Sequence, residues 1–241
     1  MFLAIDIGNT NIVCGLYDGS DWIHQFRISS DLNFWDEFKQ LKKFNIKKIG
    51  ISSVVPTLTL VIYEAAKNLF NINPFIITSK NANIKLKVDH PLEVGSDRIC
   101  NVASAKIIGL PSIVGDIGSA TNFDVIDSKG AFIGGVIAPG IQTAAHNLFK
   151  KAALLKEIAF TMPNETIGKN TKTNLQSGIM FGAIDSIDGM FKRIKKESGW
   201  DNTNYIITGG FGKIISPYLQ TEHILSPNLT LDGIRLIYES Q

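Results

Sequence analysis

Short apolar runs separated by polar turns fill the first thirty residues of the chain. Phe2–Ile7 is such a run, and Gly8 ends it, which predicts a buried strand. Asn11–Tyr17 and Trp22–Ser29 predict two more strands, and residues 18–21 between them have the composition of a turn. Strands joined by turns this short run antiparallel. The pattern therefore predicts a three-stranded antiparallel meander.

Helical and strand patterns alternate after the meander. They predict a helix around Phe34, Phe38 and Leu41, a strand over Lys48–Ser52, a helix from Pro56 to Phe70, a strand over Phe75–Thr78 and a helix over Arg98–Ile108. Pro56 suits the first turn of its helix, where the backbone N–H has no partner inside the helix. A meander followed by crossovers has the element order of the ribonuclease-H-like core of actin-like kinases.

The second half of the chain begins with the same pattern. It predicts strands over Ser112–Ile117, Asn122–Asp127 and Ala131–Ile137, helices over Thr143–Ile158 and Thr173–Ser198, a strand over Tyr205–Thr208, and helices near Lys213 and Asp232. No long glycine- or serine-rich linker separates the halves. We therefore expect an α/β protein of two tandem ribonuclease-H-like (actin-like ATPase) domains, 1–111 and 112–241, with mixed sheets flanked by helices.

A short motif occurs at the same place in both halves. Asp6-Ile7-Gly8 ends the first predicted strand of the first half, and Asp116-Ile117-Gly118 ends the first predicted strand of the second. Hydroxyl or amide residues follow each motif, and each leads into another strand. A match this short can arise by chance, but its equivalent position in two similar strand orders favours an internal duplication.

Each of these motifs can bind phosphate. Gly8 has no side chain, so a phosphate can approach the backbone N–H groups, and Asn9 and Thr10 add neutral donors. Asp6 would be repelled by phosphate and is better suited to hold Mg²⁺ through water. The alternative is an ordinary hairpin turn, because Gly-Asn is common in turns. Two such loops, the second over Asp116–Thr121, could together hold a triphosphate.

Three further segments have both a functional and a structural interpretation. Thr208–Gly212 is a glycine-rich turn after a buried strand, which suits an adenine or a ribose but also simple packing. Gly134–Gly140 ends a strand and is either another wall of the site or a turn. In Gly95–Arg98, Asp97 is either a helix N-cap or the base that takes a proton from a substrate hydroxyl, with Arg98 beside it for an anionic group. The residues alone leave these alternatives open.

Composition narrows the class of protein. The 241 residues are 44% hydrophobic and 19% charged with a net charge of +2, which is typical of a globular protein and gives no support for nucleic-acid binding. Cys14 and Cys100 are isolated, so we expect buried free thiols rather than a zinc site. The chain shows no signal peptide and no apolar stretch of membrane-spanning length. We therefore expect a soluble, cytoplasmic protein that binds no membrane.

Taken together, the motifs resemble those of type III pantothenate kinases in order and spacing over essentially the whole chain. The segments that carry the resemblance are Asp6–Thr10, Gly95–Arg98, Asp116–Thr121, Gly134–Gly140, Asn170-Thr171 ahead of Gln176–Gly178, and Thr208–Gly210. The resemblance implies ATP-dependent phosphorylation of pantothenate to 4'-phosphopantothenate, the first step of coenzyme A biosynthesis. It also implies a homodimer whose pantothenate pocket lies near the subunit interface.

The resemblance assigns roles residue by residue. It implies that Asp97 is the proton acceptor and that Asp116 ligates a monovalent cation, K⁺ or NH₄⁺, besides the Mg²⁺ that accompanies ATP. It implies pantothenate contacts from Gly95, Ser96, Asp97, Arg98 and Thr171. It implies ATP contacts from Asp6, Ile7, Gly8, Asn9, Thr10, Asn11, Ile12, Val13 and Ser119.

The chain departs from the family pattern at three positions. Ser119 and Asn122 stand where threonine is usual, and Val88 stands where many relatives have a tyrosine that lines the pantothenate site. Two alternatives are a non-catalytic regulatory relative, akin to a transcription accessory factor, and another actin-like small-molecule kinase. The retained aspartates of the motifs and the lack of a DNA-reading motif disfavour the first. The spacing from Gly95–Arg98 to the second loop disfavours the second.

Overall fold

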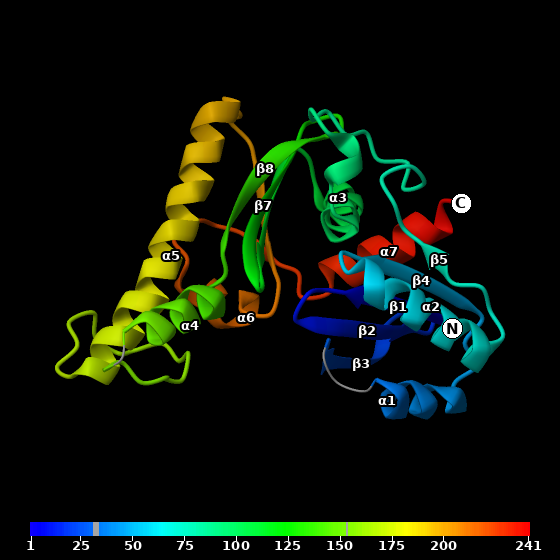
Figure 1. The fold of residues 1–241 in the computed structure, drawn as a ribbon. Helices are drawn as coiled ribbons and strands as arrows, with labels where there is room; N and C mark the ends of the chain where they lie inside the picture. The colour runs from blue at the N-terminus through cyan, green and yellow to red at the C-terminus, as the bar shows by residue number, and fades with distance from the viewer. Residues whose placement is uncertain (31–33, 153) are drawn as a thin grey trace. The chain divides into compact units, whose positions relative to one another are not determined.

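Two five-stranded mixed sheets organise the computed structural model, which describes residues 1–30, 34–152 and 154–241 (Figure 1). Each sheet belongs to one of two units. Unit 1 consists of Met1–Ile108 and Asn228–Gln241, and unit 2 consists of Gly109–Pro227. No helix in the described ranges is long and apolar enough to cross a membrane.

The sheet of unit 1 begins with the predicted meander. Its strands are β1 (Phe2–Ile7), β2 (Asn11–Tyr17), β3 (Trp22–Ser29), β4 (Lys48–Ser53) and β5 (Phe75–Ile76). They are ordered β3-β2-β1-β4-β5, with β1, β2 and β3 antiparallel, β4 parallel to β1 and β5 parallel to β4. The prediction of a meander followed by crossovers is confirmed for this unit.

Alternation along β1 gives the sheet of unit 1 two buried faces. Phe2 and Ala4 point to one face, and Leu3, Ile5 and Ile7 point to the other. The Leu3 face packs against α1 (Trp35–Gln40) and α2 (Pro56–Phe70), and the Phe2 face packs against α3 (Ser96–Ile108) and α7 (Leu229–Glu239). Two short 3-10 helices, η1 (Leu41–Lys43) and η2 (Pro91–Glu93), complete the helical segments of this unit in the described residues.

Helix α7 is the part of unit 1 that lies last in the sequence. Leu231, Ile234 and Ile237 are buried in the core that also contains Phe2. A Cβ on Gly233 would collide with the backbone of Cys100, so the absence of a side chain lets α7 lie directly against α3. The expected second domain, 112–241, included this helix. By packing, α7 is part of unit 1, and the boundary between the units falls after Ile108 instead of after residue 111.

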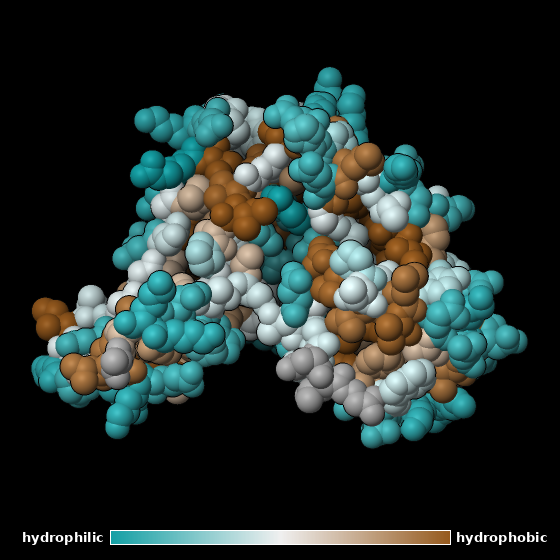
Figure 2. Space-filling model, in the orientation of Figure 1, coloured by the Kyte–Doolittle hydropathy of each residue, from teal (hydrophilic) through white to brown (hydrophobic). Residues whose placement is uncertain are grey.

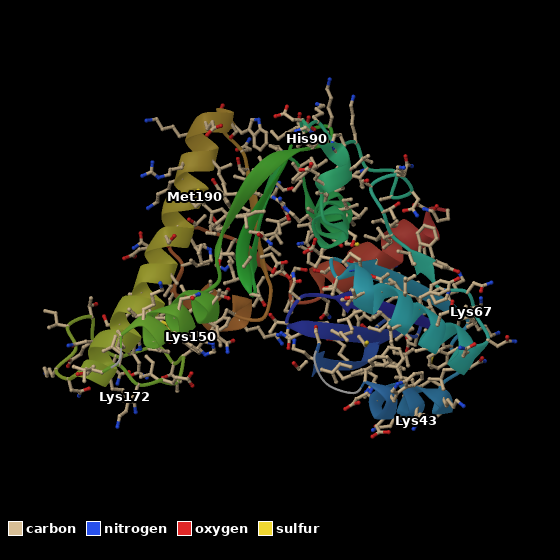
Figure 3. The ribbon with its side chains drawn as sticks, in the orientation of Figure 1. Lys43, Lys67, His90, Lys150, Lys172 and Met190 are labelled. Atoms are coloured by element: carbon tan, nitrogen blue, oxygen red, sulfur yellow. The ribbon has the colours of Figure 1, made fainter. Side chains whose placement is uncertain are left out.

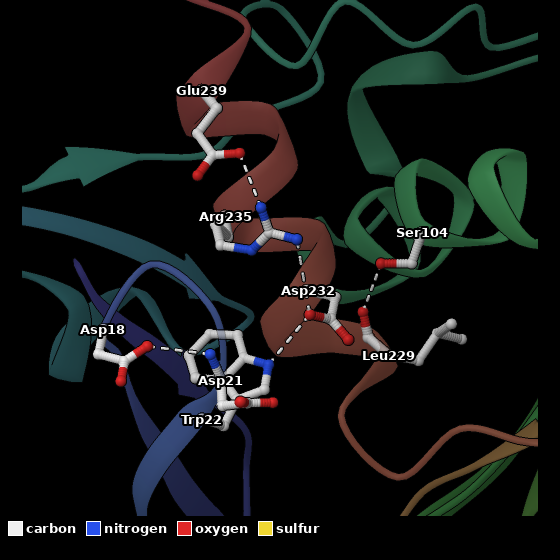
Figure 4. Close-up of polar contacts among 8 residues, drawn as sticks. All are labelled: Asp18, Asp21, Trp22, Ser104, Leu229, Asp232, Arg235 and Glu239. Atoms are coloured by element: carbon white, nitrogen blue, oxygen red, sulfur yellow. Dashed lines mark hydrogen bonds and ion pairs between the residues drawn. The ribbon is translucent and has the colours of Figure 1, made fainter. Parts of the chain in front are cut away.

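Polar contacts also fasten α7 (Figure 4). Trp22 Nε1 donates to Asp232 Oδ1 at 3.0 Å, and Ser104 Oγ donates to the Leu229 carbonyl at 2.7 Å. Arg235 pairs with Asp232 at 3.9 Å and with Glu239 at 2.8 Å along the same helix. These contacts join α7 to β3 and to α3 of unit 1.

The sheet of unit 2 repeats the strand order of unit 1. Its strands are β6 (Ser112–Ile117), β7 (Ala120–Ile126), β8 (Phe132–Pro139), β9 (Asn204–Thr208) and β10 (Ile224–Leu225), in the order β8-β7-β6-β9-β10. Here β6, β7 and β8 are antiparallel, β9 is parallel to β6 and β10 is parallel to β9. The predicted duplication is therefore present at the level of topology.

The helices of unit 2 differ from those of unit 1 in length. They are α4 (Ile141–Lys151), α5 (Thr171–Ser198) and α6 (Gly212–Ile215), with the 3-10 helix η3 (Ser216–Tyr218). The sequence predicted a helix to residue 158, but α4 ends at Lys151. Helix α5 lies along the sheet (Figure 1), and its Ile184, Ile187 and Phe191 pack against Ile113 and other residues of the strands.

Candidate active site

The two Asp-Ile-Gly motifs lie at equivalent positions in their sheets. Asp6 stands opposite Val13 on β2 and beside Ser52 on the parallel strand β4. Asp116 stands opposite Asn122 on β7 and beside Thr208 on the parallel strand β9. Each aspartate is thus the penultimate residue of its strand, at the carboxyl edge where ligands of open α/β sheets bind.

Both motifs close a tight turn. Gly8 N–H donates to the Asn11 carbonyl at 2.9 Å, and Gly118 N–H donates to the Ala120 carbonyl at 2.9 Å. In each unit the parallel neighbour also donates to the isoleucine of the motif, through Val54 N–H at 3.1 Å in unit 1 and Phe211 N–H at 3.0 Å in unit 2. The two turns therefore stand at equivalent places, but the second is one residue shorter, because Ile7 pairs with Ile12 whereas Ile117 pairs with Thr121.

The β1–β2 turn exposes part of the segment predicted to bind ATP. Asn9 and Thr10 are exposed at its tip. Ser30 holds the turn from behind, because its Oγ donates to the Gly8 carbonyl at 2.7 Å and its N–H donates to the Thr10 carbonyl at 3.0 Å. The backbone and side chains at this tip are accessible and held in place, as phosphate binding requires.

Two of the residues predicted to bind ATP point into the core. Ile7 and Ile12 are both 0% exposed and belong to the core between the sheet, α1 and α2. Only their backbone groups can face a nucleotide. Asn11 and Val13 are partly exposed and lie at the start of β2.

A hydrogen-bond network joins Asp6 to the start of α3. Ser52 Oγ donates to Asp6 Oδ1 at 2.9 Å and lies 3.1 Å from Ser96 Oγ. Ser96 Oγ accepts from Ser53 N–H at 2.8 Å and reaches the Ser53 carbonyl at 2.9 Å. Ser96 is only 5% exposed, so its hydroxyl faces the protein interior. A contact between Ser96 and pantothenate would therefore use the backbone.

Asp97 and Arg98 lie in the first turn of α3. Asp97 Oδ1 accepts from Arg98 N–H at 2.8 Å, and no described residue hydrogen bonds to its other oxygen. Burial raises the pKa of Asp97, while the Arg98 N–H and the Arg98 guanidinium partly offset the increase. A Cβ on Gly95 would collide with Asp97 Oδ1. Because α3 begins at Ser96, Asp97 lies inside the first turn and is not the N-cap; its carboxylate accepts from the N–H of the next residue and is partly desolvated.

Oxygen atoms and a glycine surround Asp116 in unit 2. Asn122 lies directly opposite Asp116, so both side chains project from the same face of the sheet. Asn122 Oδ1 is buried with no hydrogen-bond partner among the described residues. Gly209, with φ of +86°, follows β9, and a Cβ there would lie 2.5 Å from Asp116 Oδ1. The backbone can come this close to the carboxylate only because residue 209 is glycine.

The Gly134–Gly140 segment supports the β6–β7 turn. Ser119, exposed at the tip of that turn, accepts through its carbonyl from Gly140 N–H at 3.1 Å and from Thr143 Oγ1 at 2.7 Å. A Cβ on Gly140 would collide with the carbonyl oxygens of Gly118 and Ser119. The second half of this motif therefore positions the turn that carries Ser119.

Thr171 is the first residue of α5 and is exposed. Asn170 caps the helix, and its side chain and that of Thr173 form a reciprocal capping box. The neighbouring Lys172 marks this end of α5 in Figure 3. Val88, which replaces the usual tyrosine, is partly exposed in unit 1.

Sequence reasoning did not identify Ser52. A serine within a strand pattern carries no signal of its own. The available signal was position, because Ser52 ends an apolar strand whose parallel neighbour ends in Asp6, and such strand ends share one edge of a sheet.

Comparison with known proteins gives the following similarities. The type III pantothenate kinase family model matches residues 2–193. The type III pantothenate kinase of Exiguobacterium sibiricum is 39% identical, over 99% of this chain and 99% of that protein. A Campylobacter jejuni structure described as a Baf family transcriptional activator is 21% identical with a TM-score of 0.64, over 99% of this chain and 98% of that one. A ROK hexokinase from Thermus thermophilus is 11% identical with a TM-score of 0.51, over 99% of this chain and 98% of that one. The two structures bear out the predicted fold class and nothing beyond it.

Proposed function

The chain belongs to the type III pantothenate kinase family, and we propose that it phosphorylates the primary hydroxyl of pantothenate with ATP, using Asp97 as the proton acceptor. The product is 4'-phosphopantothenate, and the reaction is the first step of coenzyme A biosynthesis. The hydroxyl oxygen bonds to the γ-phosphorus, the bond to the β–γ bridging oxygen breaks, and ADP leaves. The hydroxyl proton passes to the Asp97 carboxylate.

The position and chemistry of Asp97 carry this proposal. Its carboxylate is partly desolvated at the start of α3, and burial raises its pKa. A carboxylate whose pKa lies closer to neutrality accepts a proton more readily in the transition state. Arg98 follows directly, where its guanidinium can offset the charge of an anionic substrate or of the transferring phosphoryl group.

The two turns are the proposed ATP-binding elements. Gly8 and its neighbours over Asp6–Val13 would hold phosphates through backbone N–H groups, with donors from Asn9 and Thr10. Ser119 would contact ATP from the second turn. The exposure of both tips supports this assignment.

The oxygen donors of the site are compatible with both proposed cations. No group of three His, Cys, Asp or Glu residues in the described ranges could enclose a metal ion. A single carboxylate such as Asp6 fits Mg²⁺, which keeps several waters and binds substrate phosphates. The Asp116 carboxylate and the unpartnered Asn122 oxygen fit K⁺ or NH₄⁺, which would supply positive charge beside the phosphates.

The proposed pantothenate contacts come from two elements. Gly95, Ser96, Asp97 and Arg98 begin α3, and Thr171 begins α5. Ser96 would contribute its backbone, because its hydroxyl is used within the protein. We also propose that the enzyme works in the cytoplasm, where ATP is available, and binds no nucleic acid, in keeping with its net charge of +2.

We further propose that the enzyme is a homodimer that uses an apolar surface of unit 2. A hollow of about 300 Å³ lies between β7, β8, α4 and α5, and Met190 reaches into the same region from α5 (Figure 3). Hydrophobic residues gather between α5 and β8 on the face shown in Figure 2, and Ile137 of β8 is 67% exposed. Light scattering at assay concentrations should report a dimer, and a fully active monomer would contradict this assembly.

The decisive test of the proposed chemistry is Asp97→Asn in a coupled ADP-release assay with ATP and pantothenate. Loss of a general base typically costs about 10²- to 10⁴-fold, so kcat should fall on that scale while nucleotide binding, measured by calorimetry, survives. Asp89→Asn, which changes an exposed aspartate of the same unit, should leave kcat unchanged. Near-normal turnover by Asp97→Asn would leave Asp97 only the local hydrogen bond to the Arg98 N–H.

The same variant should also show that the ionised Asp97 carboxylate destabilises the folded protein. Because its pKa is raised in the folded state, its ionisation lowers the free energy of unfolding as pH rises from the unfolded pKa through the folded one. Asp97→Asn should therefore raise the melting temperature at pH 7 relative to wild type, and this gain should shrink at acidic pH. A melting temperature lowered equally at all pH values would indicate a purely structural aspartate.

One comparison favours a second candidate function. The Campylobacter jejuni structure is described as a transcriptional activator and shares the fold. A regulatory protein of this fold would not need Asp97, Asp6 and Asp116. If the wild-type chain releases no ADP with pantothenate, while ATP binding persists, this candidate takes the place of the kinase.

A further inference from the structure

We propose that Ser52 is a positioning residue for phosphoryl transfer, because its hydroxyl links the Asp6 carboxylate to Ser96 and so holds the start of the helix that carries Asp97. This inference rests on the proposed roles of Asp6 and Asp97. It adds a coupling between the phosphate-binding turn and the base within unit 1.

The location of Ser52 places it between the two elements. It stands beside Asp6 in the parallel register of β1 and β4, and it is 0% exposed. Its Oγ lies 2.9 Å from Asp6 Oδ1 and 3.1 Å from Ser96 Oγ. No bulk water is available to substitute for either contact, so the hydroxyl is the direct connection between strand β1 and helix α3.

The number of available protons fixes the direction of this connection. An ionised carboxylate can only accept, so the single Ser52 proton is donated to Asp6. The Ser52 oxygen then accepts from Ser96, whose own oxygen accepts from Ser53 N–H at 2.8 Å. The Ser96 proton can otherwise reach the Ser53 carbonyl at 2.9 Å. A chain of hydrogen bonds that all point toward Asp6 is strengthened by the negative charge at its end.

Cys100, one turn further along α3, is a further neighbour of this chain. Its thiol is fully buried and is hydrogen-bonded with Ser52. Burial, together with the charges of Asp6 and Asp97, raises the pKa of Cys100 well above its usual range, although the hydrogen bond with Ser52 partly offsets the increase. The thiol therefore stays neutral and adds a second neutral contact between Ser52 and α3.

The link acts on catalysis because Ser96 immediately precedes Asp97. Ser96 Oγ accepts from the N–H of Ser53, and its single proton is shared between the Ser53 carbonyl and Ser52 Oγ, which in turn donates to Asp6. A shift of this anchor moves the proposed base relative to the substrate hydroxyl. Displacements of about 1 Å can cost up to about 10²-fold in rate. Loss of one anchor among several should cost less, so we expect Ser52→Ala to lower kcat by roughly tenfold.

Kinetics of a double-mutant cycle test the coupling. Ser52→Ala should lower kcat roughly tenfold while the KM for ATP changes less than about twofold, because the backbone donors of the turn remain. Ser52→Cys, which keeps size and a weak donor, should fall between wild type and Ser52→Ala. In a Ser96→Ala background, Ser52→Ala should cost less than about twofold, since the chain is already broken.

Ser104→Ala is the matched control. Ser104 is also a buried serine of unit 1, and its Oγ donates to the Leu229 carbonyl at 2.7 Å, away from the Asp6 network. Ser104→Ala loses one buried hydrogen bond, whereas Ser52→Ala loses the bond to Asp6 and the one with Ser96, so thermal melts should show a loss of stability in both variants and a larger one in Ser52→Ala. Only Ser52→Ala should lose turnover.

Hydrogen exchange gives a readout that does not depend on turnover. Mg²⁺ with a non-hydrolysable ATP analogue should slow exchange of the amides of Arg98 and Ile99 in wild type and in Ser104→Ala, but not in Ser52→Ala. Equal protection in all three proteins, together with kcat within twofold of wild type for Ser52→Ala, would overturn the inference. If wild type fails to phosphorylate pantothenate but the difference in exchange is present, the proposed function fails while the link through Ser52 stands.

Discussion

The β1–β2 turn of unit 1 and the β6–β7 turn of unit 2 stand at equivalent places in their sheets but have different neighbours on the parallel strand. Beside Asp6 that strand offers the hydroxyl of Ser52, which donates to the carboxylate. Beside Asp116 it offers Thr208 and then Gly209, whose backbone lies against the carboxylate. The duplicated topology thus fixes where a carboxylate stands, and the residue beside it determines whether a hydroxyl or a glycine backbone lies against it.

The helices that cover equivalent faces of the two sheets also differ in their polar contacts. Helix α2 covers the unit 1 sheet with apolar residues such as Ile62 and has no side-chain cap. Helix α5 covers the unit 2 sheet and is additionally tied by Asp188, whose carboxylate accepts from Gln220 N–H, Thr221 N–H and Thr221 Oγ1 at 2.6–2.9 Å. Helix α5 is therefore fixed by a buried carboxylate in addition to its apolar residues.

The largest expected effect separates the two aspartates by cation dependence. If Asp116 holds a monovalent cation, wild-type activity in Tris or sodium buffer should fall and should recover with K⁺ or NH₄⁺. A charge pair is worth ~1 kcal/mol in water and ~4 kcal/mol in a partly shielded site, so the fall should be roughly 5- to 1,000-fold. The activity of Asp116→Asn should be low in every buffer. Any residual activity of Asp6→Asn should still depend on K⁺. Full wild-type activity without either cation removes this role from Asp116.

The next effect concerns the glycine that distinguishes the second turn. Gly209→Ala should lower stability by about 1–2 kcal/mol for the left-handed backbone and by a further ~1–3 kcal/mol for the contact with Asp116. The matched control is Gly199→Ala at the end of α5, where φ is +67° but nothing lies within 4 Å of the added Cβ. For this control, chemical denaturation should show only the loss in the free energy of unfolding that the left-handed backbone causes. Equal losses in both variants would mean that the close approach to Asp116 is unimportant.

The smallest effect tests the buried charge of unit 2. Burial alone would raise the pKa of Asp188, but the hydrogen bonds from Thr221 and Gln220, with Lys192 nearby, lower it on balance. The stability that ionised Asp188 contributes is then present at pH values above the pKa of the unfolded state. It is lost as the pH falls through the pKa of the folded state. Asp188→Asn should cost about 1–3 kcal/mol at pH 7 and much less near pH 3. Asp185→Asn, exposed one turn earlier, should cost little at any pH, and a pH-independent loss in Asp188→Asn would contradict the ionic role.

Much of the fold could be predicted because local pattern and packing agree. The bounds predicted for β1, β2, β3 and β6 are those observed, since each is an apolar run that a turn sequence ends. The repeated Asp-Ile-Gly motif predicted an internal duplication, which the equal strand order of the two sheets confirms. These features depend on residues close in sequence, which pattern analysis reads directly.

The rest depends on contacts between distant residues. Strand β10 is two exposed residues that pair only with β9, so it has no periodicity of its own. The packing of α7 in unit 1 depends on Gly233 meeting Cys100, more than a hundred residues away. The inward hydroxyl of Ser96 at the start of α3 likewise depends on Ser52, which lies on strand β4. No local pattern contains such information.

The place of α7 also constrains the order in which the protein can form during synthesis. Domains near the N-terminus usually fold first as a chain leaves the ribosome. Here the strands of unit 1 and α3 emerge early, but the face around Phe2 is only partly covered until Leu229–Glu239 has been translated. Unit 2 is continuous over Gly109–Pro227 and can fold before that point. The half that begins the sequence is therefore the one that finishes folding last.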